Sequence, residues 1–153
     1  MRARTILASL AVLLASASLA LAADLTLGTW KLDEAKSKLA TAAKNSTVIY
    51  AASGDSVKIT VDGVDKDGKP VHNEWTGKYD GKDYVVTGDP NSDARSYTKV
   101  DDHTLTFSAK KAGKVTTNGK VSISADGKTR TVTVAATDAS GKKTESTAVY
   151  NRQ

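Results

Sequence analysis

Residues 119–136 read GKVSISADGKTRTVTVAA, and this stretch decides the fold. Before the Asp126-Gly127 pair, apolar residues alternate with serine; beyond it, they alternate with threonine. The apolar positions are Val121, Ile123 and Ala125 before the pair, and Val132, Val134 and Ala136 after it. This pattern predicts a β-hairpin with one buried face, because glycine supplies the positive φ that a tight turn needs.

The same turn signal recurs along the chain. Gly-Lys pairs begin at Gly68, Gly77, Gly81, Gly113, Gly119, Gly127 and Gly141. The segments between them read as short strands spaced about 8–12 residues apart, which favours an antiparallel sandwich or barrel. Tight turns join sequence neighbours, so we expect an all-β, up-and-down meander of about 8–10 strands. Closure into a barrel is favoured because it removes the two exposed edges of such a sheet.

Residues 1–22 predict a cleaved signal peptide. Two arginines precede an apolar run at 6–21, and a small-x-small cleavage site ends at Ala22. A membrane anchor is the alternative, but the run is short for a spanning helix and no basic cluster follows it. We therefore expect residues 23–153 to form a single domain that is secreted or periplasmic, without a stable membrane anchor.

Composition excludes several classes of protein. The chain has no cysteine, so a secreted domain of this sequence must be stable without disulfides. Residues 23–153 have a net charge of +3, since residues 1–22 hold two of the 22 basic residues and none of the 17 acidic ones. The basic residues are evenly spread, whereas a nucleic-acid-binding surface needs them clustered. We expect a monomer that does not bind nucleic acid.

The sequence predicts neither a metal centre nor catalysis. The two histidines, His72 and His103, stand in unrelated segments, and without cysteine they do not indicate a zinc site. Residues 63–74 partly match a calcium loop, but Gly63 stands at the first ligand position, so a hairpin turn is favoured. No nucleophile motif is present. We expect no cofactor and no enzymatic activity.

Residues 33–45 interrupt the strand pattern. Asp33 can cap a helix, and the apolar residues that follow fall near helical spacing. Either a short helix or a loop crossing one end of the sheet is expected here, between a first strand at 25–32 and a strand-and-turn pattern from Ser46 onward.

The sequence GTWKL at 28–32 opens the first expected strand. It resembles the Gly-x-Trp start of the calycins, the superfamily of lipocalins, fatty-acid-binding proteins and avidins, and looks most like the fatty-acid-binding protein opening. The stretch WKLDEAKS at 30–37 also resembles the start of bacterial periplasmic isoprenoid-binding lipocalin-like proteins. The resemblance implies a barrel that binds a lipid or a similar molecule. It also implies that Trp30 closes one end of the barrel beneath a late-strand arginine, either Arg130 or Arg152.

Candidate ligand contacts come from the few arginines and aromatic residues. Arg95 and Tyr97 lie two residues apart on one strand face, and fatty-acid-binding proteins hold the ligand carboxylate with an Arg-x-Tyr pair. Arg130 shares a face with apolar residues, which places it inward; an outward or barrel-closing arginine is the alternative. The expected cavity residues are Trp75, Arg95, Tyr97, Phe107 and Arg130. Trp30 and Arg152 are expected at the closed end.

Three functions are compatible with the sequence. Small inward residues in a wide barrel favour a cavity, so the favoured interpretation is non-catalytic binding of a small hydrophobic or amphipathic ligand. The alternative is a filled barrel or sandwich that acts through its surface as an interaction or inhibitor module. A barrel enzyme would need acid and base groups such as His72 and Glu74 inside the cavity. A cavity inside the barrel would favour ligand binding, and a filled interior would favour the surface module.

Overall fold

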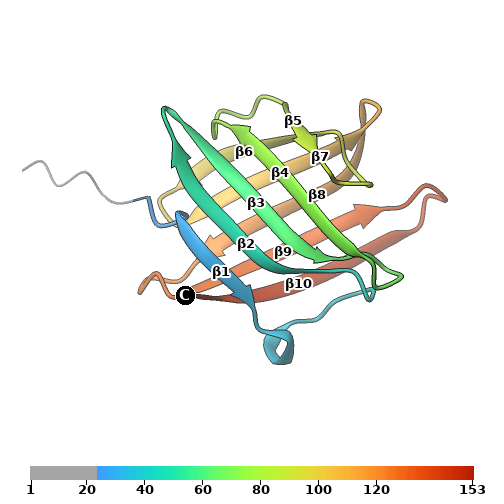
Figure 1. The fold of residues 1–153 in the computed structure, drawn as a ribbon, viewed down its shortest axis with the longest axis horizontal. Helices are drawn as coiled ribbons and strands as arrows, with labels where there is room; N and C mark the ends of the chain where they lie inside the picture. Colours follow the sequence, from blue (N-terminus) through green and yellow to red (C-terminus); the bar gives the residue numbers. More distant parts are fainter. Residues whose placement is uncertain (1–23) are drawn as a thin grey trace, which may run out of the picture.

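The computed structural model describes residues 24–153, which form ten strands closed into one barrel (Figure 1). The strands are β1 (Gly28–Leu32), β2 (Lys44–Ser53), β3 (Ser56–Val64), β4 (Pro70–Gly77), β5 (Tyr84–Thr87), β6 (Ala94–Asp101), β7 (Thr104–Lys111), β8 (Lys114–Ile123), β9 (Thr129–Thr137) and β10 (Lys143–Arg152). Consecutive strands pair antiparallel, so the expected all-β meander and its closure are confirmed. The expected signal peptide, 1–22, lies outside the described residues.

The barrel closes through β1, which lies between β2 and β10 (Figure 1). Trp30 of β1 is opposite Arg152 of β10 in this pairing. The first strand begins at Gly28, later than expected. The backbone carbonyls of Leu25 and Leu27 instead accept hydrogen bonds from the Arg152 guanidinium, so the segment before β1 is fixed by a side chain and not by the sheet.

The segment at 33–45 is mostly loop. Its helical part is η1 (Glu34–Lys36), a single 3₁₀ turn capped by the Asp33 carboxylate, which accepts from the Lys36 amide at 3.2 Å. An isolated bridge between Lys38 and Thr147 then ties the loop to β10. A longer helix does not form, and the last two residues of the segment already belong to β2.

The Gly-Lys signal marks turns at most places, but Gly77 and Gly119 lie within strands. Gly127, between β8 and β9, has a φ of 70°, as the hairpin prediction requires. Gly119 lies inside β8 instead, opposite Phe107 of β7. A Cβ atom at Gly119 would lie 2.4 Å from the Phe107 ring, so this glycine makes room for an aromatic side chain.

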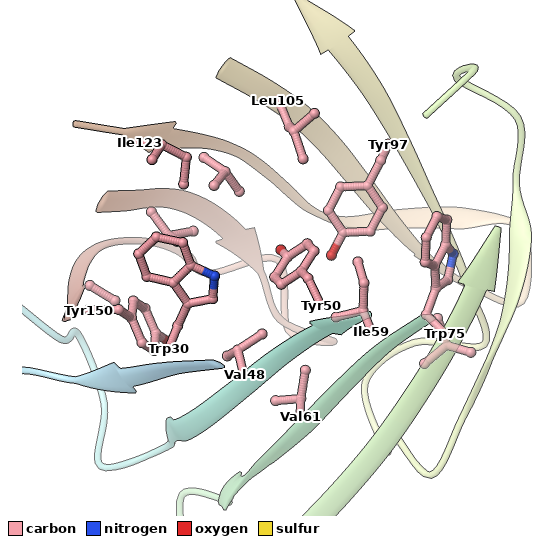
Figure 2. Packing of buried hydrophobic residues seen from close by; sticks show 14 residues of the cluster. Trp30, Val48, Tyr50, Ile59, Val61, Trp75, Tyr97, Leu105, Ile123 and Tyr150 are labelled. Carbon is pink, nitrogen blue, oxygen red and sulfur yellow. The ribbon is translucent and has the colours of Figure 1, made fainter. Parts of the chain in front are cut away.

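The inward faces of the strands build the core. Ile59, Leu105 and Val121, all from the expected alternating strands, are buried almost completely. Figure 2 shows the two tryptophans, Trp30 and Trp75, toward opposite sides of the buried cluster, with tyrosine rings between them. Large aromatic side chains therefore supply much of the core of the barrel.

Candidate functional site

A cavity of about 320 Å³ occupies the interior of the barrel. Its lining includes residues of three segments at one end of the barrel, namely 39–45, 64–65 and 89–92. These segments lie in, or directly next to, the connections β1–β2, β3–β4 and β5–β6, so the cavity reaches that end. The volume lies at the lower end of the range for small-molecule sites. The barrel is thus not completely filled by side chains, as binding of a small ligand in its interior requires.

Arg130, on β9, is the charged group deepest in the cavity wall. It is 5% exposed and shares the inward face with Val132 and Val134, which also line the cavity. Its Nη2 donates a hydrogen bond of 2.9 Å to the hydroxyl oxygen of Tyr50. The guanidinium carbon lies 4.7 Å from the ring centroid of Tyr150 and 5.2 Å from that of Tyr50. Two aromatic rings and one hydroxyl therefore hold the guanidinium.

The charge of Arg130 is not balanced by a protein group. Within residues 24–153, no carboxylate oxygen lies within 4.0 Å of its guanidinium nitrogens. Its Nε and Nη1 are buried and have no hydrogen-bond partner. Arginine keeps its proton in proteins, so the charge persists even here. A buried cation without a nearby negative charge carries a large desolvation cost, which cation–π contacts offset only in part.

Tyr50 keeps its proton beside this cation. Burial raises the pKa of the Tyr50 hydroxyl well above its usual value, and the nearby Arg130 charge lowers the pKa by less. Burial also raises the pKa of the Tyr150 hydroxyl. Neither tyrosine therefore supplies a negative charge near neutral pH. The floor of the cavity has a net positive charge and offers unpaired N–H donors.

Arg95, on β6, lines the same cavity but has a carboxylate partner. Its Nη2 lies 3.1 Å from Asp89, and both side chains are largely buried. Asp89 also accepts hydrogen bonds from the hydroxyl of Ser92 and the amide of Asn91, within the β5–β6 connection. The Arg95 charge is therefore largely compensated, and its role in the structure is to fix this connection at the rim of the cavity.

The aromatic candidates separate into lining and supporting residues. Tyr97 and Phe107 line the cavity, with ring centroids 5.5 Å apart. Trp75 is not among the lining residues: its ring packs edge-on against Tyr97 at 4.8 Å, and its indole N–H donates to the Arg95 carbonyl at 2.8 Å. The structure thus brings Arg95, Tyr97, Phe107 and Arg130 together, and places Trp75 behind them.

Sequence reasoning did not single out Tyr50, Tyr150 or Asn73 as cavity residues. Tyr50 and Tyr150 come from β2 and β10, far from each other in sequence, and meet only across the closed barrel. For Asn73, the sequence did contain an indication of an inward polar side chain. It is a polar residue at an inward position, two residues from the apolar Trp75 on β4, where strand alternation expects an apolar side chain.

The opposite end of the barrel is closed by Trp30, which is fully buried. The Arg152 guanidinium carbon lies 4.3 Å from the Trp30 ring centroid, and the indole N–H donates to the Thr26 carbonyl at 3.0 Å. Of the two arginines that the calycin resemblance offered, Arg152 lies over Trp30, while Arg130 faces the cavity. This arrangement separates a structural arginine from a cavity arginine.

The histidine–carboxylate pair considered for an enzyme lies outside the cavity. His72 is exposed and Glu74 is partly buried, with Nε2 and Oε1 3.8 Å apart, and neither lines the cavity. His72 Nδ1 lies 2.6 Å from Asp62, which raises the pKa of His72 above its usual value. In residues 24–153, no group of three or more histidine, aspartate or glutamate side chains is arranged to hold a metal ion. Nor does this part of the chain contain a helix long and apolar enough to cross a membrane.

Fold and site together define a small closed β-barrel with a positively charged interior cavity. No family model and no curated protein matches the chain. The structure of EF1p2_mFAP2b bound to DFHBI is similar, with a TM-score of 0.49 and 15% identity over 86% of this chain and 97% of that chain. The redesigned β-barrel mFAP1 bound to DFHBI gives a TM-score of 0.44 and 17% identity, over 84% and 95% of the two chains. The redesigned β-barrel b11L5F_LGL gives 0.43 and 13%, over 84% and 92%.

Proposed function

We propose that this protein is an exported, non-catalytic binding protein whose cavity takes one small amphipathic acid. The observation that carries the proposal is Arg130, a buried guanidinium whose Nε and Nη1 have no hydrogen-bond partner and which has no carboxylate within reach in the described residues. A carboxylate or similar anion would supply both the missing charge and the missing acceptors. The apolar part of the ligand would lie along Tyr97, Phe107 and the valines of the wall.

The size of the cavity limits the ligand. A volume of about 320 Å³ lies at the lower end of the range for small-molecule sites. Medium-chain carboxylic acids are of this order, and a ligand with a large ring system would need the cavity to expand. The binding energy would come from burying the apolar chain, and selectivity for acids from Arg130.

The test compares decanoic acid with decanol, which has the same chain but no charge. Isothermal titration calorimetry and native mass spectrometry on the purified protein should show that decanoic acid binds at least about tenfold more tightly. In Arg130→Met this preference should vanish, because methionine keeps an apolar volume but offers no donor. Equal affinity of the wild-type protein for both compounds, or binding of neither, would overturn the proposal.

A matched control uses Val132, which lies two residues from Arg130 on the same face of β9 and also lines the cavity. Val132→Ala should weaken acid and alcohol by similar factors, because it changes apolar contact alone. Export has its own test. Expressed with its full sequence in a bacterial host, the protein should be recovered outside the cytoplasm with a mass that begins at Ala23.

A further inference from the structure

A second polar group of the cavity has no partner, and it comes from the wall opposite Arg130. Asn73, on β4, is 5% exposed and lines the cavity, and its side-chain Oδ1 has no hydrogen-bond partner. Around the ten-stranded barrel, β4 lies five strands from β9 in either direction. The cavity therefore lies between a donor on one wall and an acceptor on the other.

Among residues 24–153, the buried side-chain polar atoms without a hydrogen bond are concentrated at this one cavity. In residues 24–153, the buried side-chain atoms that lack a hydrogen bond are Asn73 Oδ1, Arg95 Nε, Arg130 Nε and Arg130 Nη1. All three residues line the same cavity. Buried polar groups in folded proteins are nearly always paired, and an unpaired group destabilises the protein. A concentration of such groups at one cavity matches a ligand that carries both acceptors and donors of hydrogen bonds.

Asn73 Oδ1 requires a different ligand group than Arg130 does, because it accepts hydrogen bonds and Arg130 donates them. An amide oxygen accepts hydrogen bonds, so the group that pairs with it must be a donor such as a hydroxyl or an amine. The carboxylate that fits Arg130 is an acceptor and cannot pair with Asn73 Oδ1. The neighbouring inward residues of β4 are Val71 and Trp75. Valine has no donor, and the indole N–H of Trp75 already donates to the Arg95 carbonyl.

We infer that the ligand is a hydroxylated medium-chain acid, with its carboxylate at Arg130 and its hydroxyl donating to Asn73. This inference rests on the proposed function and adds to it the second polar group of the ligand. An unsubstituted acid would leave Asn73 buried and unpaired in the complex. A site that pairs with a ligand hydroxyl discriminates against the analogue that lacks it, because the protein group then loses its only partner.

The experiment uses two matched series of probes, the unsubstituted acids with 6, 8, 10 and 12 carbons and their ω-hydroxy counterparts. Calorimetry should show that the wild-type protein prefers the hydroxy acid by about fivefold to tenfold at one chain length, the range of one net hydrogen bond. The preference should peak at that length, because the barrel fixes the separation between Arg130 and Asn73. In Asn73→Leu, the preference for the hydroxyl should be lost and the unsubstituted acid should bind at least as well as before.

Val71→Ala is the matched control, since Val71 is the inward residue two positions before Asn73 on the same strand and also lines the cavity. It should weaken both series alike. Thermal unfolding of Asn73→Leu without ligand adds a readout that needs no binding: the variant should unfold at the same or a higher temperature, because an unpaired buried polar group is replaced by an apolar one.

The outcomes separate the two proposals. Tight binding of both series with no hydroxyl preference at any chain length overturns the role of Asn73 and leaves acid binding intact. A preference that persists in Asn73→Leu also overturns it. Failure of the wild-type protein to bind any acid of either series overturns the proposed function, and this inference with it.

Discussion

The guanidinium of Arg152 lies over the ring of Trp30, with 4.3 Å between its central carbon and the ring centroid. The two residues are opposite each other where β1 meets β10, so the contact lies at the closure of the barrel. The same guanidinium donates to the backbone carbonyls of Leu25, Leu27 and Gly127. One side chain thus joins the segment before β1, the β8–β9 turn and the last strand.

The first prediction concerns this closure. Arg152→Met should lower the free energy of unfolding by about 2–4 kcal/mol, because three part-buried carbonyls lose a charged donor and Trp30 loses its cation. Urea denaturation followed by tryptophan fluorescence measures the change. Lys143→Met, an exposed position on the same strand, should change stability by less than about 0.5 kcal/mol. If both variants unfold alike, Arg152 does not hold the closure.

The second prediction concerns the cost of keeping Arg130 buried. In the ligand-free protein, the double variant Arg130→Met with Tyr50→Phe should be more stable than the wild type by about 1–3 kcal/mol. The tyrosine is changed as well, since its hydroxyl pairs with Arg130 at 2.9 Å and would otherwise be left alone. Denaturation without ligand measures this, and a clear loss of stability would mean that the charge is compensated by a group or a water that fills the cavity.

The third prediction tests the packing of an aromatic ring over a glycine. Gly119→Ala should lower stability by about 1–3 kcal/mol. The new Cβ would lie 2.4 Å from the Phe107 ring and 2.9 Å from the Thr133 carbonyl oxygen. Adding Phe107→Leu should restore part of the loss, since the smaller side chain frees the space. No rescue in the double variant would attribute the loss to the backbone oxygen instead.

The fourth prediction concerns pH. The Asp62 carboxylate, 2.6 Å from His72 Nδ1, raises the pKa of His72 above its usual value, with smaller contributions from Glu74. A histidine pKa that is higher in the folded protein stabilises the fold below the unfolded pKa, and this contribution is lost as the pH rises through the folded pKa. Titration by NMR should show a lower His72 pKa in Asp62→Asn.

At weakly acidic pH the wild type should accordingly be more stable than Asp62→Asn. The difference between their unfolding free energies should shrink as the pH rises to weakly alkaline values. Asp102→Asn, an exposed carboxylate that pairs with Lys99 and not with histidine, is the control and should leave the His72 titration unchanged. A His72 pKa that is the same in wild type and Asp62→Asn would contradict the ion pair.

The sequence predicted the secondary structure well where the signals are local. Alternation identified the inward faces of β3, β7, β8 and β9, and Asp-Gly at 126–127 identified the turn between β8 and β9. It failed at Gly77 and Gly119, because a turn glycine and a strand glycine packed against an aromatic ring look alike in sequence. It also left 33–45 open between helix and loop, since contacts with β10 decided for a single 3₁₀ turn.

The candidate site was predictable only in part. Arg95, Tyr97, Phe107 and Arg130 all line the cavity, and their inward positions follow from strand alternation. Alternation could not say that Arg95 has Asp89 as a partner while Arg130 has no carboxylate in the described residues, because ion pairs across loops have no period. Trp75 was also expected in the lining. In the structure its ring packs against Tyr97 and is not part of the cavity lining.

By itself, the sequence determined an antiparallel meander, since period-two alternation and tight turns are properties of neighbouring residues. The tertiary structure alone decided which residues meet across the barrel. Tyr50, Arg130 and Tyr150 come together, and Asn73 lies on the wall opposite Arg130, only because β1 pairs with β10 and closes the sheet. Closure sets the register around the whole ring of strands, and that register decides which polar groups find partners inside and which stay free for a ligand.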